Sequence, residues 1–319
     1  MTDEILQVSD LRVYYHTPSG PVKAVDGIDF VLHKGERFGL VGESGSGKST
    51  TAWAIMRMIK PPGVIAGGTI RLGDTQLELL SEADIKHVRL AEIAMVPQGA
   101  MNSLNPVMRI GGQILDGMRS HRNGRKDPKA VERLPELLAT VGLLPHVLRL
   151  YPHELSGGMK QRVCIAIAIS MEPKVIIADE PTSALDVVVQ RHIMQTLSSV
   201  QRRLDASILL VGHDMGLMPK FADRIGVMYG GKLVEVGPVR DIFKDPKHPY
   251  TQLLISSLPS LDEKGALHGI PGTPPSLLSP PSGCVFHPRC PHVMPRCSID
   301  VPAQRSVGPD RSVACHLYE

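Results

Sequence analysis

One nine-residue stretch, Gly42-Glu43-Ser44-Gly45-Ser46-Gly47-Lys48-Ser49-Thr50, constrains the fold of this chain more than any other feature. It matches the pattern G-x-x-x-x-G-K-[ST] and lies between a short apolar run, residues 38–41, and a helix-like run from residue 51. Glycine lets the backbone turn its N–H groups toward an anion, because no Cβ stands in the way. The stretch therefore predicts a loop that cradles a polyphosphate at the start of a helix.

The polar residues of this loop fit nucleotide binding with a divalent cation. Lys48 is placed to reach the β- and γ-phosphates, and the hydroxyl of Ser49 to bind Mg²⁺. One alternative is a glycine-rich turn with an incidental lysine, which the strand–loop–helix context disfavours. A dinucleotide-binding loop would need a third glycine at position 50, where Thr50 stands.

Length and composition limit the possible domain organisation, partners and location of the chain. The 319 residues are 42% apolar, which suffices for one large domain, or one domain with an appendage. The formal net charge of +3 comes from scattered charges, so no nucleic-acid partner is expected. The acidic start, Met1-Thr2-Asp3-Glu4, lacks a secretory signal, and no apolar run approaches the ~18 residues that span a bilayer. We expect a cytosolic chain whose membrane role, if any, comes through partners.

Two strand-like segments precede the phosphate loop. Residues 5–15 and 22–32 have strand patterns and are separated by a turn at residues 17–20, which predicts antiparallel strands. Tyr14 or Tyr15 could stack on an adenine ring, and an aromatic side chain that only covers the sheet surface is the alternative. From the residues alone, both interpretations stand.

A helical segment interrupts the chain after the loop. The apolar strand 93–96 ends near Gln98, and about residues 99–172 read as an insert that is mostly helical. Within it, Leu155-Ser156-Gly157-Gly158-Met159 opens a strong helix, so free N–H groups there could face an anion. That anion would not be the one held by the chain's own phosphate loop.

Later strands end in polar residues. The apolar run 175–178 delivers Asp179 and Glu180 to its carboxyl end, where α/β sheets place ligands. Two adjacent carboxylates at such a place need a cation or a shared proton. Residues 183–186 follow, and the apolar strand 207–211 ends close to His213. A glycine pair at 230–231 predicts a hairpin between residues 225–229 and 232–236.

In this order, the motifs resemble those of the ATP-binding subunits of ABC transporters. They are the Walker A loop, Gln98, residues 155–159, the strand with Asp179-Glu180, residues 183–186 and His213, and the resemblance covers about residues 5–245. It implies an α/β fold: a P-loop NTPase core with a mixed sheet, an N-terminal antiparallel β-subdomain, a helical signature subdomain at about 99–172, and a small Cys-rich C-terminal extension.

The resemblance also implies roles for individual residues. Glu180 would be the general base, with His213 at the γ-phosphate and Gln98 at the Mg²⁺ and the attacking water. Tyr15 would stack on adenine. The ATP-binding set is Tyr15, Gly42, Ser44, Gly45, Ser46, Gly47, Lys48, Ser49 and Thr50. The Mg²⁺ set is Ser49, Gln98 and Asp179. The set that completes a second subunit's ATP site is Ser156, Gly157, Gly158 and Asp186.

Composition shifts after residue 245, which predicts domains at 1–245 and 246–319. The element His248-Pro249-Tyr250-Thr251 and the Pro-rich segment after it resemble the C-terminal extension of oligopeptide/dipeptide ABC importers. The segment of about 35 residues that contains the tail cysteines has few large apolar side chains, so it needs a cross-link or a bound metal to fold. We therefore expect the tail to have a structural role and to lie away from the phosphate chemistry.

Four of the five cysteines lie in this tail, and Cys164 is expected to pack in the core. Four thiolates in a cytosolic, loop-rich segment indicate a metal centre, although their spacing differs from common zinc sites. The resemblance favours a [4Fe–4S] cluster; Zn²⁺ or merely reduced cysteines are the alternatives. The proposed ligands are Cys284, Cys290, Cys297 and Cys315.

The predicted function is ATP hydrolysis that energises import of peptides or a related small solute. The resemblance implies two transmembrane permease subunits, a second related ATP-binding subunit in a heterodimer or a homodimer, and an extracytoplasmic solute-binding protein, with this chain at the cytoplasmic face of the membrane. Importers of oligosaccharides, nickel or glutathione are alternatives, and a soluble ABC ATPase is a further one. Such ATPases usually carry two domains or a long coiled coil, and about 57 positions between Gln98 and Leu155 leave no room for one.

Overall fold

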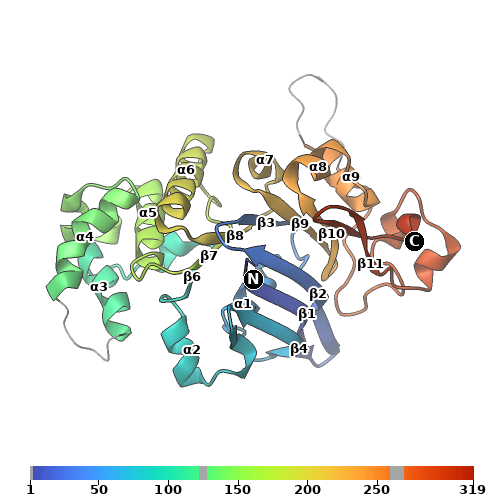
Figure 1. The fold of residues 1–319 in the computed structure, drawn as a ribbon, viewed down its shortest axis with the longest axis horizontal. Coiled ribbons are helices and arrows are strands. Elements are labelled where there is room, and N and C mark those ends of the chain that lie inside the picture. Colours follow the sequence, from blue (N-terminus) through green and yellow to red (C-terminus); the bar gives the residue numbers. More distant parts are fainter. Residues whose placement is uncertain (1–2, 122–127, 259–268) are drawn as a thin grey trace. The chain divides into compact units, whose positions relative to one another are not determined.

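The computed structural model describes residues 3–121, 128–258 and 269–319. The chain divides into two compact units, each assembled from segments that are distant in the sequence (Figure 1). Unit 1 contains Met1–Ile5, His33–Glu36 and Leu79–Leu210, and unit 2 contains Leu6–Leu32, Arg37–Glu78 and Val211–Glu319.

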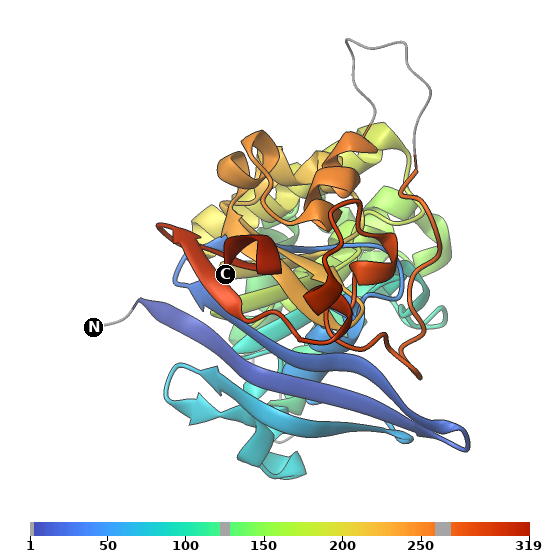
Figure 2. The ribbon, with the colours of Figure 1, turned by 90° about the vertical axis from the view of Figure 1, so that its right-hand side faces the viewer.

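Antiparallel strands form the first sheet of the chain, as predicted. Its order is β2 (Gly20–His33), β1 (Glu4–Thr17), β4 (Gly63–Leu72) and β5 (Thr75–Gln76). In Figure 2, β1 and β2 (blue) and β4 (cyan) run side by side as long ribbons. One face is apolar, because Leu6, Val8 and Leu11 are buried while polar residues separate them.

Unit 2 also contains five strands of mixed direction. Their order is β11 (Gln304–Gly308), β12 (Arg311–Ala314), β10 (Lys232–Pro238), β9 (Arg224–Tyr229) and β3 (Arg37–Val41). Strands β3 and β9 are parallel, whereas β9, β10, β12 and β11 pair antiparallel. The predicted hairpin is present: Gly230 and Gly231 have φ of 56° and 78°, as a two-residue turn between twisted strands requires.

Four helices of unit 2 complete its α/β character. They are α1 (Lys48–Ile55), α7 (Met218–Phe221), α8 (Val239–Lys244) and α9 (Pro249–Ser256). Helix α1 begins directly after the glycine-rich loop, and α9 begins at the predicted His-Pro-Tyr-Thr element.

Unit 1 combines three buried strands with the helical insert. The strand order is β8 (Ser207–Val211), β7 (Val175–Asp179) and β6 (Ile93–Val96), and β6 and β7 are parallel, with Ile93 opposite Val175. All residues of β7 and β8 are buried, as in sheets that are covered on both faces. The helices are α2 (Glu82–Val88), α3 (Ile110–Ser120), α4 (Pro128–Thr140), α5 (Gly157–Ala168) and α6 (Val187–Leu204).

The C-terminal tail is held on unit 2 by a buried carboxylate. The Glu235 side chain on β10 is 0% exposed, and Arg311 Nη2 donates to its Oε1 at 2.9 Å. The same carboxylate accepts the backbone N–H groups of Lys247 and His248 at 3.0 and 2.9 Å. Removing one partner of a buried ion pair is far more costly than the pair is stabilising. Glu235 therefore fixes both the start of the tail and its last strand.

An aromatic cluster adds the apolar part of this attachment. The ring of Phe286 lies 5.1 Å from that of Tyr229 and 5.4 Å from that of Tyr250, and all three side chains are buried. The tail thus shares unit 2 with the phosphate loop. The boundary near residue 245 stays a prediction, whereas the α/β class with its mixed sheet, N-terminal antiparallel sheet and helical insert is confirmed.

Candidate functional site

The glycine-rich loop has the backbone that its sequence predicts. Gly42, Gly45 and Gly47 have φ of 148°, 78° and 104°, a region that side chains disfavour. A Cβ at Gly42 would lie 2.1 Å from the carbonyl oxygen of Met228, and a Cβ at Gly47 would lie 2.2 Å from that of Ala24. Gly47 caps the N-terminus of α1, so the loop presents its N–H groups at a positive helix end.

Lys48 is folded into this loop. Its residue is 5% exposed, and Nζ donates to the carbonyl oxygens of Gly42 and Glu43 at 2.9 and 2.8 Å and to Ser46 Oγ at 3.2 Å. Ser49 lies half-buried in the first turn of α1, whereas Ser44 and Gly45 are exposed. A lysine, a ring of N–H groups and a neighbouring hydroxyl form an anion site.

The two tyrosines of β1 differ in their partners. Tyr14 donates its hydroxyl to Asp26 Oδ1 at 2.5 Å, and burial, reinforced by that carboxylate, raises the pKa of Tyr14 to about 12. Tyr15 lies opposite Gly63, and a Cβ added at Gly63 would come within 2.6 Å of the Tyr15 ring. Tyr15 is half-buried. The structure therefore assigns Tyr14 to the sheet and leaves Tyr15 as the candidate for base stacking.

His213 also belongs to unit 2. It follows the end of β8 and is exposed, and its carbonyl oxygen accepts the N–H of Met215 at 3.2 Å. Asp214 caps the short turn that comes next, with Oδ1 accepting the N–H of Gly216 at 2.9 Å. The histidine thus sits on a short, hydrogen-bonded loop after a buried strand.

Unit 1 brings Gln98 and Glu180 together. Gln98 Nε2 donates to Glu180 Oε2 at 2.7 Å, and both residues follow the carboxyl ends of adjacent parallel strands, β6 and β7. Glu180 has a φ of 45°, and Ser183 donates both its N–H and its hydroxyl to the Glu180 carbonyl oxygen, at 3.1 and 3.0 Å. Strained backbone of this kind concentrates at functional sites. Asp179, next to it, is fully buried.

The predicted signature residues lie at the starts of two helices of unit 1. Ser156 caps α5, because its Oγ accepts the N–H of Met159 at 3.3 Å, and Asp186 caps α6, because its Oδ1 accepts that of Val189 at 2.9 Å. A Cβ at Gly158 would lie 2.7 Å from Val189 Cγ1. Gly158 is therefore required where α5 passes close to α6, in addition to any contact with an anion.

The predicted site residues are divided between the units. Unit 2 carries Tyr15, the loop 42–50 and His213, and unit 1 carries Gln98, Asp179, Glu180, Ser156–Gly158 and Asp186. Two residues that contact the loop, Tyr250 and Arg289, were not predicted from the sequence, and both bind Glu43. They are 207 and 246 positions from Glu43, so no local pattern could have indicated them.

The tail cysteines do not form the predicted metal site in this structure. Among the described residues, no group of three or more His, Cys, Asp or Glu side chains could hold a metal ion. Burial, reinforced by the other three tail cysteines, raises the pKa of Cys284 to about 11. Burial likewise raises the pKa values of Cys290 and Cys315. The described residues therefore give no support to the predicted cluster: burial favours neutral thiols, whereas metal ions bind thiolates. Cys164 is buried in α5, as expected.

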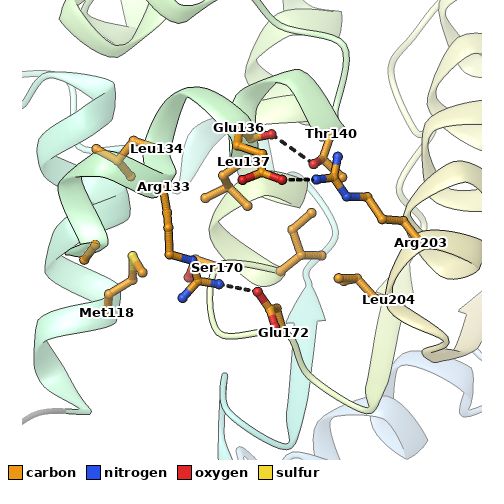
Figure 3. A pocket seen from close by; sticks show the side chains of 12 residues that line it. Met118, Arg133, Leu134, Glu136, Leu137, Thr140, Ser170, Glu172, Arg203 and Leu204 are labelled. Carbon is orange, nitrogen blue, oxygen red and sulfur yellow. Dashed lines mark hydrogen bonds and ion pairs between the residues drawn. The ribbon is translucent and has the colours of Figure 1, made fainter.

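A pocket of about 80 Å³ in unit 1 contains none of the predicted site residues (Figure 3). Helix α4, the residues after α5 and the end of α6 line it, with Leu134, Leu137 and Leu204 among the apolar lining residues. Two ion pairs flank it: Arg133 with Glu172, and Arg203 with Glu136 at 2.5 Å. Both pairs are largely exposed, so each contributes little to stability. Ser170 in the lining is 2% exposed, and its hydroxyl has no hydrogen-bond partner among the residues that the structure describes.

A glycine cradle, a buried lysine and a helix N-terminus define a phosphate-binding protein of the P-loop class. Residues 25–183 match the family described as ABC transporter, and residues 234–297 match the family described as oligopeptide/dipeptide transporter, C-terminal region. Relatives are similar over nearly the whole chain. The oligopeptide transport ATP-binding protein AppD of Bacillus subtilis is 44% identical, over 99% of this chain and 97% of that protein. The oligopeptide transport ATP-binding protein OppD of Salmonella typhimurium is 43% identical, over 98% of this chain and 93% of that protein.

Two solved structures are similar to this chain. The dimeric, post-hydrolysis ATP-binding cassette MJ0796 bound to ADP and Pi gives a TM-score of 0.64 at 26% identity, covering 74% of this chain and 99% of the other. The protein cbiO1 from Clostridium perfringens, part of an ABC transporter complex, gives a TM-score of 0.65 at 29% identity, covering 76% of this chain and 92% of the other. The chain belongs to the family of ATP-binding subunits of oligopeptide/dipeptide ABC transporters. As a member, it is an ATPase whose hydrolysis is coupled to transport.

No helix within residues 3–121, 128–258 and 269–319 is long and apolar enough to cross a membrane.

Proposed function

We propose that this chain hydrolyses ATP to energise import of peptides through a membrane transporter. The observation that carries the proposal is the end-to-end similarity to the AppD protein, 44% identity over 99% of this chain, which includes the tail. The relatives AppD, OppD and DppD are named for oligopeptide and dipeptide transport. We assign residues 1–245 to the ATPase and residues 246–319 to the extension.

Within the ATPase, we assign a role to each residue of the predicted ATP site. Lys48 and the loop N–H groups bind the phosphates, and Tyr15 stacks on the adenine. Ser49, Gln98 and Asp179 hold the Mg²⁺ shell; the buried carboxylate of Asp179 suits this, because oxygen ligands are what Mg²⁺ prefers. Bound Mg²⁺ neutralises charge that develops on the phosphates.

Glu180 acts as general base toward the attacking water. Its carboxylate accepts the amide N–H of Gln98 at 2.7 Å, a contact that helps to orient the carboxylate toward the water. His213 contacts the γ-phosphate, and its exposed side chain on a short loop supports that role. Phosphoryl transfer to water needs positioned charge more than covalent chemistry, which this set of residues supplies.

Each ATP site is completed by a second ATP-binding subunit. The N-terminal end of α5, with Ser156, Gly157 and Gly158, would face the γ-phosphate held by that partner, and Asp186 lies in the loop between the two sites. The similar cassette MJ0796 is described as dimeric, which supports this arrangement. A related second chain in a heterodimer, or another copy of this chain, would then close the site when ATP binds.

The further partners follow from the transporter class. Two transmembrane permease subunits would provide the path, and an extracytoplasmic binding protein would deliver the solute. The chain would bind the permeases peripherally, at the cytoplasmic face of the membrane. No feature of the described residues identifies the solute itself, so related solutes such as oligosaccharides, nickel or glutathione are tested alongside peptides.

We also propose a loaded form of the tail in which Cys284, Cys290, Cys297 and Cys315 rearrange to bind a [4Fe–4S] cluster, with Zn²⁺ as the alternative. The other three tail cysteines contribute to the raised pKa of Cys284, which supports a location of the four thiols near one another. Anaerobically purified protein should contain iron and sulfide and absorb in the blue part of the visible spectrum, and Cys290→Ser should abolish that absorbance. Stoichiometric zinc in a colourless protein, or no metal at all, would contradict the cluster.

Uptake by the reconstituted transporter tests the main proposal. Proteoliposomes with both permeases, the binding protein and ATP inside should accumulate labelled di- and oligopeptides, and the uptake should require Lys48. Lys48→Ala should abolish ATP binding in an equilibrium titration and uptake together. Accumulation of nickel, glutathione or an oligosaccharide in place of peptides would redirect the substrate assignment, and uptake that persists in Lys48→Ala would refute the energising role.

A further inference from the structure

Arg289 of the C-terminal tail makes a two-pronged ion pair with Glu43 of the phosphate loop. Nη1 of Arg289 lies 2.8 Å from Glu43 Oε2, and Nη2 lies 3.2 Å from Oε1. The arginine side chain is 5% exposed and the glutamate side chain 24%. Paired N–H···O bonds fix orientation as well as distance, which a lysine in the same place could not do. The contact therefore constrains where Glu43 sits.

Every nitrogen of this guanidinium is engaged. Nη1 also donates to the hydroxyl of Tyr229 at 3.1 Å, Nε donates to the carbonyl oxygen of Pro271 at 2.7 Å, and Nη2 donates to that of Ile270 at 3.1 Å. The arginine thus joins the Pro-rich segment and the end of β9 to the loop. A buried arginine with all its nitrogens satisfied has little freedom to move.

Two residues of the tail and Lys48 of the phosphate loop form hydrogen bonds with Glu43. Its side chain binds Arg289, and its backbone N–H donates to the hydroxyl of Tyr250 at 2.8 Å. Its carbonyl oxygen accepts Lys48 Nζ at 2.8 Å. Glu43 lies between Gly42 and Gly45, whose backbones have positive φ and little intrinsic preference for one conformation. The tail therefore restrains the residue to which the phosphate-binding lysine is anchored.

We propose that Arg289, assisted by Tyr250, is a positioning residue for the phosphate loop, so that the tail sets the affinity for ATP without touching the nucleotide. This rests on the loop being the ATP site. A preorganised loop loses less conformational freedom when the phosphates bind, so ATP binds more tightly. The tail, expected from the sequence to be purely structural, thereby acts on the site.

The test uses the full chain and three principal variants, to which Arg289→Lys and a double variant are added. Arg289→Met removes the charge and the five donors while keeping much of the volume, and Tyr250→Phe removes only the hydroxyl. Arg296→Met is the matched control, because Arg296 is a tail arginine whose ion pairs are with Glu319 at 2.8 Å and Asp300 at 3.8 Å, both in the tail. ATP affinity is measured by equilibrium titration, thermal unfolding reports the fold, and KM and kcat are measured in the assembled transporter.

Arg289→Met should weaken ATP binding by about tenfold or more and raise KM for ATP, while kcat at saturating ATP stays within about twofold. Tyr250→Phe should weaken binding by a smaller factor, and Arg289→Lys should recover only part of the loss because it cannot pair with both oxygens. Arg296→Met should bind ATP as the unmodified chain does. The ATP affinity of the double variant Glu43→Gln, Arg289→Met should be close to that of Arg289→Met alone, because both substitutions remove the same ion pair.

Equal ATP affinity in the unmodified chain and in folded Arg289→Met would overturn the positioning role while leaving ATP binding intact. A parallel loss of affinity and Tm in Arg289→Met and Arg296→Met would reduce the contact to tail stability, which also overturns it. If Arg289→Met does not fold, Tyr250→Phe decides, and unaltered affinity there counts against the proposal. An unmodified chain that binds no ATP would instead refute the proposed function.

Discussion

Gln98 donates a hydrogen bond of 2.7 Å from its side-chain amide to Oε2 of Glu180. The two residues are 82 positions apart, and they meet because β6 and β7 are parallel neighbours with Val96 opposite Ala178. Each side chain then emerges at the carboxyl end of its strand, where α/β proteins place their ligands. The contact links the residue proposed to contact Mg²⁺ with the proposed general base.

Replacement of Gln98 should therefore affect turnover more than nucleotide binding. We expect Gln98→Ala to lower kcat by about tenfold or more, because Glu180 loses the donor that fixes its carboxylate, while ATP affinity changes little. Gln98→Glu places a second carboxylate beside Glu180 and should lower kcat further, because the like charges repel and the donor is lost. ATPase assays measure both effects. An unchanged kcat in Gln98→Glu would show that the contact is absent in the working enzyme.

Gly158 should be required for packing as well as for the proposed phosphate contact. A Cβ there would lie 2.7 Å from Val189 Cγ1, so Gly158→Ala should lower the free energy of unfolding by roughly 1–3 kcal/mol. Val189→Ala removes the clashing methyl groups, and the double variant should regain much of the stability. If ATPase activity stays low in the double variant, the glycine is needed at the anion too. Thermal unfolding that is unaffected by Gly158→Ala would contradict the close approach.

His248 should make the chain sensitive to acid. Its ring is buried, Nδ1 accepts the N–H of Tyr250 at 3.0 Å, and burial lowers its pKa to about 3 from an ordinary 6.5. Below pH 6.5 the unfolded chain binds a proton that the folded chain excludes. The stability contributed by the neutral ring is thus complete above pH 6.5 and falls as the pH decreases toward 3, by roughly 2–4 kcal/mol near pH 4.

His248→Asn is the control for this effect. An asparagine oxygen can cap α9 in the same way and does not titrate. Denaturant unfolding between pH 7 and pH 4 should show a shallower loss of stability in His248→Asn than in the unmodified chain. Identical slopes would mean that His248 does not contribute to the acid sensitivity.

Ser170 should be a position where a smaller side chain is favourable. Its buried hydroxyl finds no hydrogen-bond partner in the described part of the chain, and an unsatisfied hydroxyl costs about 1 kcal/mol or more. Ser170→Ala should therefore raise the free energy of unfolding by about 1 kcal/mol. Ser120→Ala serves as the comparison, since that exposed hydroxyl donates to the carbonyl oxygen of Gly117. A destabilised Ser170→Ala would indicate that the hydroxyl is satisfied in solution.

Local patterns predicted the phosphate loop, the hairpin at Gly230-Gly231 and the strands ending at Gln98 and Asp179. These features depend on residues within a few positions of one another, where φ preferences and hydrophobic periodicity act. The strand pairing that joins Gln98 to Glu180 was suggested only by the general rule for α/β sheets. The resemblance already favoured Tyr15 over Tyr14 for base stacking, whereas the hydrogen bond of Tyr14 to Asp26, 12 residues away, emerged only from the structure.

The contacts of the tail could not be predicted. Arg289 lies 246 positions from Glu43, and Glu235 gives no sign in the sequence that it will be a buried carboxylate. Such pairs form because the chain folds back over long distances, and single residues carry no pattern that specifies their partner. For the cysteines, their number and spacing suggested a metal site, but ligand geometry depends on where four separate turns lie, which spacing does not determine.

The most direct test of the central claim is ATP hydrolysis by the assembled transporter that contains Glu180→Gln. The amide keeps the size of the carboxylate and removes its ability to accept a proton from water. We predict that Glu180→Gln retains ATP binding, loses turnover, and accumulates a nucleotide-bound dimer of ATP-binding subunits that can be isolated by size. Unchanged ATPase activity in this variant would contradict the assignment of Glu180 and, with it, the proposed composite site.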